Sequence, residues 1–297
     1  MKKRLITGIS GALFAISLLV FMQYPFVIGI PLAFFATVSV HEIMHVIKCE
    51  NKVLTAVAMV FTAIVPLYTD IKHYLVYHRG STFFDNIKLP LWAVLTVYIF
   101  LIMILMLRNY EKTKFEQAAM AIFSSIALAF GYTSMIYLRD IDHMWPEYFQ
   151  QSHGLFVTLS AMLCAWLSDT FAYFFGRKFG KHKLAPVISP KKSVEGAIAG
   201  VLGNTLVVVI VYLVASRYFD RLPDSITLIK VIPACMAVTV MGMCGDLSAS
   251  VIKRNFGAKD YGTFFPGHGG VMDRFDSFLF TLPTTYLIIT MVMTFIA

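Results

Sequence analysis

Residues 89–107 read LPLWAVLTVYIFLIMILML and contain no charged side chain. A helix of this length crosses the hydrocarbon core of a bilayer, and backbone groups in lipid must find their hydrogen bonds within the segment itself. The stretch is therefore predicted to be a transmembrane helix. The chain of 297 residues is 58% hydrophobic and 14% charged, whereas an average soluble domain is about 45–50% apolar and about 25% charged. This composition indicates an integral membrane protein.

The chain holds nine such apolar runs, which predicts an all-α, polytopic membrane protein with about nine transmembrane helices. The first run is interpreted as a retained helix, because it is longer than the apolar part of a signal peptide and no small-residue cleavage site follows it. The predicted spans lie within residues 5–22, 25–47, 53–69, 89–107, 117–137, 154–175, 195–216, 226–245 and 276–296.

Lysines and arginines are distributed unequally between alternate connections. Of the 25 in the chain, 18 lie at the amino end and in residues 48–52, 108–114, 177–192 and 253–274. The positive-inside rule places these segments, and therefore the amino terminus, in the cytoplasm. The net charge of +8 accordingly suits helix orientation and contact with anionic lipid. No nucleic-acid-binding motif is present, so nucleic acid is not expected as a partner.

The two longest polar connections on the predicted cytoplasmic side are residues 177–194 and 246–275. We therefore divide the chain into residues 1–110, helices expected to act as scaffold or as dimer contacts, and residues 111–297, the expected catalytic membrane domain. This division predicts an active site that faces the cytoplasm.

Acidic residues border the second connection. Asp246 ends one apolar run, and Asp273 and Asp276 begin the next. Residues three apart lie on one face of a helix, so both carboxylates of that pair are predicted to project together. Asp246 from a neighbouring helix would complete an all-oxygen site. Such a site suits Mg²⁺, which takes one or two carboxylates together with substrate phosphates and water.

Cations and glycines accompany these carboxylates. Metal-binding carboxylates mixed with cations that neutralise phosphate are the components of phosphoryl or nucleotidyl transfer sites. Gly267, Gly269 and Gly270 would let backbone N–H groups approach a phosphate closely. A solvated basic loop is the alternative, but it leaves the acidic residues and His268 unexplained. The candidate cations are Arg177, Lys178, Lys181, Lys183, Lys191, Lys192, Lys253, Arg254, Lys259 and Arg274.

The first connection has two acidic residues at its borders. Asp169 lies about two helical turns inside an apolar run, where an unpaired carboxylate would cost a few kcal/mol. It is therefore predicted to face a polar cavity, with a metal, a cation or a substrate hydroxyl as partner. Glu195 starts the next helix and is a candidate substrate-site residue. The alternative for Glu195 is the first-turn acid of a capping box with Ser193.

Two blocks in the carboxyl-terminal half resemble a known family. Residues 250–276 follow S-x-I-K-R-x4-K-D-x-G-x2-F-P-x-H-G-G-V-x-D-R-F-D, and residues 168–196 read SDTFAYFFGRKFGKHKLAPVISPKKSVEG. Both blocks, in order and spacing, resemble those of phosphatidate cytidylyltransferases, also called CDP-diacylglycerol synthases. The resemblance implies a nucleotidyltransferase of phospholipid biosynthesis that converts CTP and phosphatidic acid into CDP-diacylglycerol and pyrophosphate.

The resemblance also implies partners and cofactors. Such enzymes are multi-pass proteins of the inner, cytoplasmic membrane, usually homodimers, with a Mg²⁺-dependent site on the cytoplasmic side. Their metal-binding aspartates correspond to Asp246 and Asp273, and our residue-based set adds Asp276. A monovalent cation such as K⁺ is a second candidate at that site. The implied partners are therefore CTP, phosphatidic acid, the lipid bilayer and a second copy of the chain.

The residues fit a direct displacement, in which the lipid phosphate attacks the α-phosphorus of CTP and pyrophosphate leaves. The lipid phosphate is already anionic, so charge neutralisation and alignment are expected to do the catalysis. Here His268 would donate to the departing pyrophosphate. The predicted catalytic residues are Asp246, Asp273, Lys192, Arg274 and His268, and the predicted substrate-binding residues are Asp169, Lys191, Glu195, Lys253, Arg254, Lys259, Gly269 and Gly270.

Three other interpretations remain open. The stretch HEIMH at residues 41–45 matches the zinc-protease pattern H-E-x-x-H, but no third ligand is evident. Polar residues at the membrane interface, or a pair that contacts the catalytic cleft, are the simpler interpretation of this stretch. A transporter using Asp169 and Asp246 would be expected to show inverted repeats, and none is visible. A CTP-dependent polyprenol kinase would transfer a different group of CTP.

Overall fold

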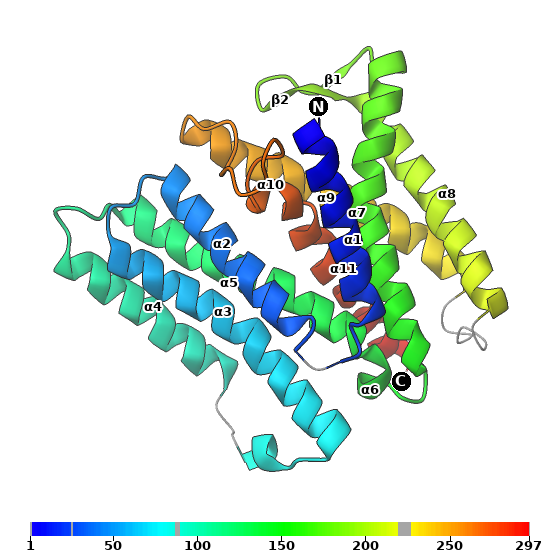
Figure 1. Ribbon diagram of the computed structural model, residues 1–297, viewed down its shortest axis with the longest axis horizontal. Coiled ribbons are helices and arrows are strands. Elements are labelled where there is room, and N and C mark those ends of the chain that lie inside the picture. The colour runs from blue at the N-terminus through cyan, green and yellow to red at the C-terminus, as the bar shows by residue number, and fades with distance from the viewer. Residues whose placement is uncertain (1, 25, 87–89, 219–226, 297) are drawn as a thin grey trace. The chain divides into compact units, whose positions relative to one another are not determined.

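The computed structural model describes residues 2–24, 26–86, 90–218 and 227–296, and its described part is predominantly helical (Figure 1). The predicted all-α class is confirmed. The long helices are α1 (Lys2–Val20), α2 (Gly29–Val46), α3 (Lys52–His73), α4 (Leu91–Arg108), α5 (Phe115–Arg139), α7 (Gln151–Phe179), α8 (Val194–Tyr218), α9 (Leu228–Asn255) and α11 (Phe278–Ile296). The short elements are η1 (Tyr74–His78), η2 (Phe83–Asn86), α6 (Ile141–Met144), α10 (Met272–Phe275) and the strands β1 (Lys183–Ala185) and β2 (Ser189–Ser193).

Eight segments of the described chain are long and apolar enough to cross a membrane. They coincide with the last eight of the nine predicted spans, which confirms a polytopic membrane protein. The first predicted span coincides with α1, which is not among the eight. A ninth crossing and a cytoplasmic amino terminus therefore stay predictions. The eight spans are Gly29–Val46, Lys52–His78, Leu91–Arg108, Phe115–Arg139, His153–Phe179, Val194–Arg217, Leu228–Asn255 and Met272–Phe295.

The chain folds as two compact units, each built from two separate stretches of sequence. Unit 1 comprises Met1–Ile136 and Phe256–Arg274, and unit 2 comprises Tyr137–Asn255 and Phe275–Ala297. This is a division by packing. The predicted division into residues 1–110 and 111–297 separates expected scaffold helices from the expected catalytic part. That functional division stays a prediction.

In unit 1, polar side chains bond between neighbouring helices. The Tyr98 hydroxyl of α4 lies 2.5 Å from the Ser125 hydroxyl of α5, and both are buried. Asp70 of α3 accepts a 3.0 Å hydrogen bond from the Phe26 N–H, just before α2. A Cβ on Gly29 would lie 2.4 Å from the Asp70 carboxylate, so only glycine fits there. Such bonds satisfy polar groups that lipid cannot hydrate, and they hold the helices together.

In unit 2, small residues let the helix backbones approach closely. A Cβ on Gly196 of α8 would lie 2.6 Å from the Ala172 carbonyl oxygen of α7, and one on Gly200 would lie 2.8 Å from the Ser168 carbonyl oxygen. This is the small-residue packing typical of membrane helices. Between α8 and α9, the buried Asn204 amide donates a 2.7 Å hydrogen bond to the Thr239 hydroxyl. These contacts set the mutual position of the helices that carry the candidate site.

Candidate active site

A two-stranded hairpin joins α7 to α8 and carries Lys191 and Lys192. Its strands β1 and β2 are antiparallel, with Lys183 opposite Ser193. The Ser193 hydroxyl accepts a 3.2 Å hydrogen bond from the Gly196 N–H, and so caps the start of α8. A Cβ on Gly176 would lie 2.8 Å from the Ser193 hydroxyl oxygen, so α7 also packs closely on this residue. The end of β2 is thereby held against both helices.

Glu195, in the first turn of α8, holds the loop that precedes β1. Its carboxylate accepts hydrogen bonds from the backbone N–H groups of Lys181 at 3.1 Å and His182 at 3.2 Å. The His182 Nδ1 atom lies 2.6 Å from the same carboxylate. Glu195 therefore positions the hairpin, and its predicted contact with substrate stays a prediction.

A cavity of about 270 Å³ that charged and apolar side chains line together lies within unit 2. We call it the charged cavity, because Asp169 of α7, Lys191 and Lys192 of β2, and Asp246 of α9 line it. Four predicted site residues from three elements are thus brought together. Asp169 lies at a cavity that cationic side chains also line, and its predicted contact with substrate stays a prediction.

Lys192 is the central cation of the charged cavity. Its ammonium forms an ion pair with the Asp246 carboxylate, and the two side chains are 26% and 18% exposed. Burial lowers the pKa of Lys192 from its ordinary value, and so does the nearby Lys253, whereas Asp169 and Asp276 act in the opposite direction. A cation that has lost part of its hydration interacts more strongly with an anion than one in bulk water.

Two more charged residues of unit 2 lie within electrostatic reach of this pair. Asp276 and Lys253 are both buried, and the charged neighbours of Asp276 are Asp169, Lys253 and Lys192. Lys253 follows Asp246 on α9 by about two helical turns, so both lie on one face of that helix. Three carboxylates and two ammonium groups therefore form one cluster.

The carboxylates of this cluster suit a magnesium ion. Among the residues that the structure describes, no group of three or more His, Cys, Asp or Glu side chains forms a preformed metal site. Asp169 and Asp246 nevertheless line one cavity with their carboxylates. Mg²⁺ needs only one or two such ligands when substrate phosphates and water complete its shell. The donor chemistry therefore fits Mg²⁺ bound together with a polyphosphate.

Residues 256–274 form the signature loop of unit 1, which Asp273 organises. One oxygen of its carboxylate accepts hydrogen bonds from the N–H groups of Tyr261 at 2.8 Å and Gly270 at 3.0 Å. Gly269 has φ +91°, a conformation that favours glycine. The Gly270 N–H is thus already engaged within the loop. Phosphate contacts by Gly269 and Gly270 stay a prediction.

Asp273 and Asp276 lie on either side of the end of a short helix. Helix α10 ends at Phe275, and Asp276 follows it in a turn. The Asp276 carboxylate accepts a 2.8 Å hydrogen bond from the Ser277 N–H, a local bond that competes with helix continuation. The helix that begins the last span is thus interrupted at Asp276, and the expectation that both carboxylates project together stays a prediction. Their assignment as metal ligands is a separate matter and stays a prediction.

Glu42 of α2 holds the same loop, and sequence reasoning did not assign it this role. Its buried carboxylate accepts 2.9 Å hydrogen bonds from the N–H groups of Val271 and Met272, one on each oxygen. A Cβ on Gly270 would lie 2.4 Å from this carboxylate. Both oxygens serve the loop, which argues against a general base in HEIMH. The sequence did contain one signal for this role: a glutamate within an apolar helix is energetically costly unless it has hydrogen-bond partners.

The remaining predicted residues lie at the surface or in the loop. Arg254 is exposed, and its guanidinium donates a 3.4 Å hydrogen bond to the Ile188 carbonyl of the hairpin. Lys191 and Lys259 are exposed. Arg274 donates a 2.8 Å hydrogen bond to the His268 carbonyl. Within the described part of the chain, the buried Nδ1 atom of His268 has no hydrogen-bond partner.

Comparison with known proteins identifies relatives of the chain. Residues 2–292 match the cytidylyltransferase family. Over 161 residues the chain is 44% identical to a phosphatidate cytidylyltransferase of Staphylococcus epidermidis, 45% to that of Staphylococcus saprophyticus and 42% to that of Staphylococcus aureus. Each alignment covers 54% of this chain and 58% of the relative. The chain thus spans less than two thirds of the length of these relatives.

The contact between Glu42 and the signature loop predicts a stability effect. Glu42→Gln replaces one acceptor oxygen with an amide group that cannot accept, so one loop N–H loses its partner. A hydrogen bond to a charged group contributes about 1.5–3 kcal/mol, and we expect the free energy of unfolding in detergent to fall by about that amount. Hydrogen exchange at the amides of Val271 and Met272 should accelerate. Thermal unfolding and exchange mass spectrometry measure both effects.

The exposed Glu50 offers a matched control, because its substitution by glutamine removes the same charge close by in sequence. Glu50→Gln should change the free energy of unfolding by less than about 0.5 kcal/mol. Wild-type exchange at both loop amides in folded Glu42→Gln protein would contradict the role of Glu42.

Proposed function

The chain belongs to the cytidylyltransferase family, and we propose that it transfers the cytidylyl group of CTP to phosphatidic acid. The products would be CDP-diacylglycerol and pyrophosphate. The observation that carries this proposal is the cluster of three carboxylates and two ammonium groups around the charged cavity, in a unit built of membrane-spanning helices. The names of the Staphylococcus relatives agree with this reaction.

The proposed reaction is a single displacement at phosphorus. A phosphate oxygen of phosphatidic acid forms a bond to the α-phosphorus of CTP, while the bond from that phosphorus to the bridging oxygen breaks. The electron pair leaves with pyrophosphate. The attacking phosphate is already an anion, so this step requires no protein nucleophile. The main obstacle is repulsion between two anions, which fixed positive charges reduce.

The cluster supplies such charges in a partly desolvated setting. The Asp246 carboxylate forms an ion pair with Lys192. A triphosphate in the charged cavity would offer Lys192 a stronger anionic partner, and Lys253 and the exposed Lys191 would add positive charge at the same end of the unit. His268, whose Nδ1 atom has no partner among the described residues, is the proposed donor to the departing pyrophosphate. Arg254 and Arg274 are the further proposed phosphate contacts.

We propose Mg²⁺ as the cofactor, held by Asp246 and by the other predicted ligands, Asp273 and Asp276. When bound, Mg²⁺ neutralises charge on the phosphates of CTP and orients them for in-line attack. A second, monovalent cation such as K⁺ remains part of the proposal. Asp273 belongs to unit 1, and its convergence with Asp246 stays a prediction.

The proposal includes a location and an assembly. The acyl chains of phosphatidic acid would stay in the bilayer, while water-soluble CTP would enter from the cytoplasm. The basic connections that border the charged cavity agree with a cytoplasmic site under the positive-inside rule. A homodimer in the inner membrane is the proposed assembly, and light scattering of the detergent-solubilised protein would measure it.

The reaction predicts where labelled phosphorus appears. Purified protein with phosphatidic acid, Mg²⁺ and α-labelled CTP should give labelled lipid, whereas γ-labelled CTP should give labelled pyrophosphate and unlabelled lipid. Inside-out membrane vesicles should use external CTP, and right-side-out vesicles should not. Label from the γ position in lipid would instead identify a kinase, and no labelled lipid from either substrate would refute the proposal.

Lys192 is predicted to act mainly on turnover. Lys192→Met removes the central cation of the charged cavity and should lower kcat by about 100-fold or more, as loss of one preorganised charge contact does in other enzymes. Lys192→Arg keeps the charge and should retain more activity. The exposed Lys112, changed to methionine, is the control and should leave kcat unchanged. Folded Lys192→Met protein with a wild-type kcat would rule out the proposed role.

The metal proposal predicts the effect of neutral ligand variants. Asp246→Asn and Asp273→Asn should each abolish turnover while the protein stays folded in detergent, because an amide binds Mg²⁺ more weakly than a carboxylate. Turnover against Mg²⁺ concentration measures this effect, with the exposed Glu147 changed to glutamine as control. Purified Asp273→Asn protein that keeps wild-type turnover at low Mg²⁺ would disprove the metal role of Asp273.

A further inference from the structure

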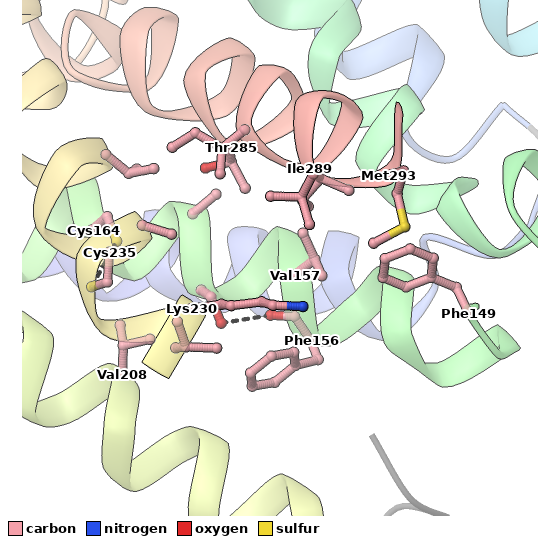
Figure 2. Close-up of a pocket in the computed structure, with 17 residues that line it drawn as sticks. Phe149, Phe156, Val157, Cys164, Val208, Lys230, Cys235, Thr285, Ile289 and Met293 are labelled. Atoms are coloured by element: carbon pink, nitrogen blue, oxygen red, sulfur yellow. Dashed lines mark hydrogen bonds between the residues drawn. The ribbon is translucent and has the colours of Figure 1, made fainter. Parts of the chain in front are cut away.

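Unit 2 contains a second cavity, of about 130 Å³, among the apolar faces of its helices (Figure 2). We call it the apolar cavity. Its inner part adjoins a buried cluster that includes Cys164 of α7 and Cys235 of α9. Its other end adjoins a cluster that includes Phe149 and Met293. The apolar side chains that line it include Phe149, Phe156, Val157, Val208, Val231, Ile288, Ile289, Val292 and Met293.

The apolar cavity suits hydrocarbon rather than water. Two hydroxyl groups in its lining already donate within their own helices, Ser160 to the Phe156 carbonyl and Thr285 to the Thr281 carbonyl, each at 2.8 Å. A lining without unsatisfied polar groups leaves a cavity of about 150 Å³ dry and able to bind apolar molecules. Pockets that enclose a drug-sized ligand measure about 300–1,000 Å³. The cavity is therefore sized for a segment of an alkyl chain.

A single charged residue lies in the lining of the apolar cavity. Of the 17 lining residues only Lys230 is charged, and it is exposed whereas Cys164, Val208 and Cys235 are buried. Figure 2 shows Lys230 among the apolar side chains that frame the cavity. The cation therefore marks the open side of the cavity.

The position of Lys230 on its helix favours an anion beside it. Lys230 lies in the first turn of α9, and that turn contains no acidic residue. The amino end of a helix carries a partial positive charge, so a cation there is unfavourable and an anion is stabilised. An apolar cavity, an exposed ammonium and a helix amino end thus occur together. This combination matches one chain and the phosphate of an anionic phospholipid.

The apolar cavity is separate from the charged cavity. Lys230 and Asp246 lie sixteen residues apart on α9, which corresponds to about 24 Å along the helix axis at about 1.5 Å per residue. A lipid whose phosphate contacts Lys230 therefore cannot present that phosphate to Asp246 and Lys192. The occupant is a second lipid, distinct from a substrate in the charged cavity.

We propose that the apolar cavity binds one acyl chain of an anionic phospholipid, whose phosphate contacts Lys230 and the amino end of α9. The lipid belongs to the leaflet at the end of unit 2 opposite the charged cavity. It fills space between α7, α8, α9 and α11, the helices that carry the charged cluster, and so supports their packing. This site does not depend on the proposed reaction.

A fluorescence experiment tests the site without CTP. Trp145 packs against the cluster of Ile141, Phe149 and Met293, so a brominated acyl chain in the apolar cavity should quench its fluorescence. Protein carrying Trp92→Phe and Trp166→Phe is reconstituted in dioleoylphosphatidylcholine vesicles with increasing brominated phosphatidylglycerol or brominated phosphatidylcholine. We expect half-maximal quenching at about fivefold lower mole fraction for phosphatidylglycerol, the ratio for one lysine contact with an anionic lipid.

Variants separate the head-group contact from the chain contact. Lys230→Ala should abolish the preference for phosphatidylglycerol, and Lys230→Arg should keep it. Ala234→Phe adds a ring to a residue that lines the apolar cavity and should reduce quenching by both lipids. The exposed Lys72 of unit 1, changed to alanine, should leave the preference unchanged. Equal quenching by both lipids with wild-type Lys230, or an unchanged preference in Lys230→Ala, would overturn the proposal.

Discussion

A charge inside a membrane-embedded helix bundle is costly unless another group compensates it, and this constraint shapes the candidate site. Lys192 pairs with Asp246. The carboxylates of Glu42 and Asp273 each accept hydrogen bonds from two backbone N–H groups of the signature loop. These contacts compensate charged side chains in an apolar protein, and among them Lys192, Asp246 and Asp273 are also the proposed contacts of a charged substrate or its metal. Structural stability and proposed chemistry therefore use the same groups.

Close packing of small residues supports this arrangement in unit 2. Gly196 and Gly200 bring α8 against α7, and Asn204 bonds α8 to α9. The same helices frame the charged cavity at one end and the apolar cavity at the other. A lipid in the apolar cavity would act on the packing of helices that also hold Asp169 and Asp246. The proposed reaction and the proposed lipid site thus share one scaffold while using separate contacts.

Candidate site residues could be predicted from sequence where an unpaired charge inside an apolar segment would be energetically costly. Asp169 in an apolar run implied a polar partner, and the structure has Asp169 at a cavity that Lys191 and Lys192 also line. Helix period alone did not reveal the turn at Asp276, where α10 ends and the Asp276 carboxylate accepts a hydrogen bond from the Ser277 N–H. Glu42 was missed since its partners, Val271 and Met272, are more than 200 residues away in sequence. A contact of that kind leaves no pattern within a short window.

The sequence by itself determined the class of the protein. Apolar runs of bilayer length are predicted to be helices, because a helix satisfies its backbone hydrogen bonds within the segment. The charged segments between these runs contain the candidate site residues. Only the tertiary structure decided which charges meet: Lys192 with Asp246, and Glu42 with the signature loop. It also decided that Lys230 lines an otherwise uncharged, mainly apolar cavity. The reason is physical, because hydrophobicity and helix period act along the chain, whereas pairing depends on distances between helices that packing alone sets.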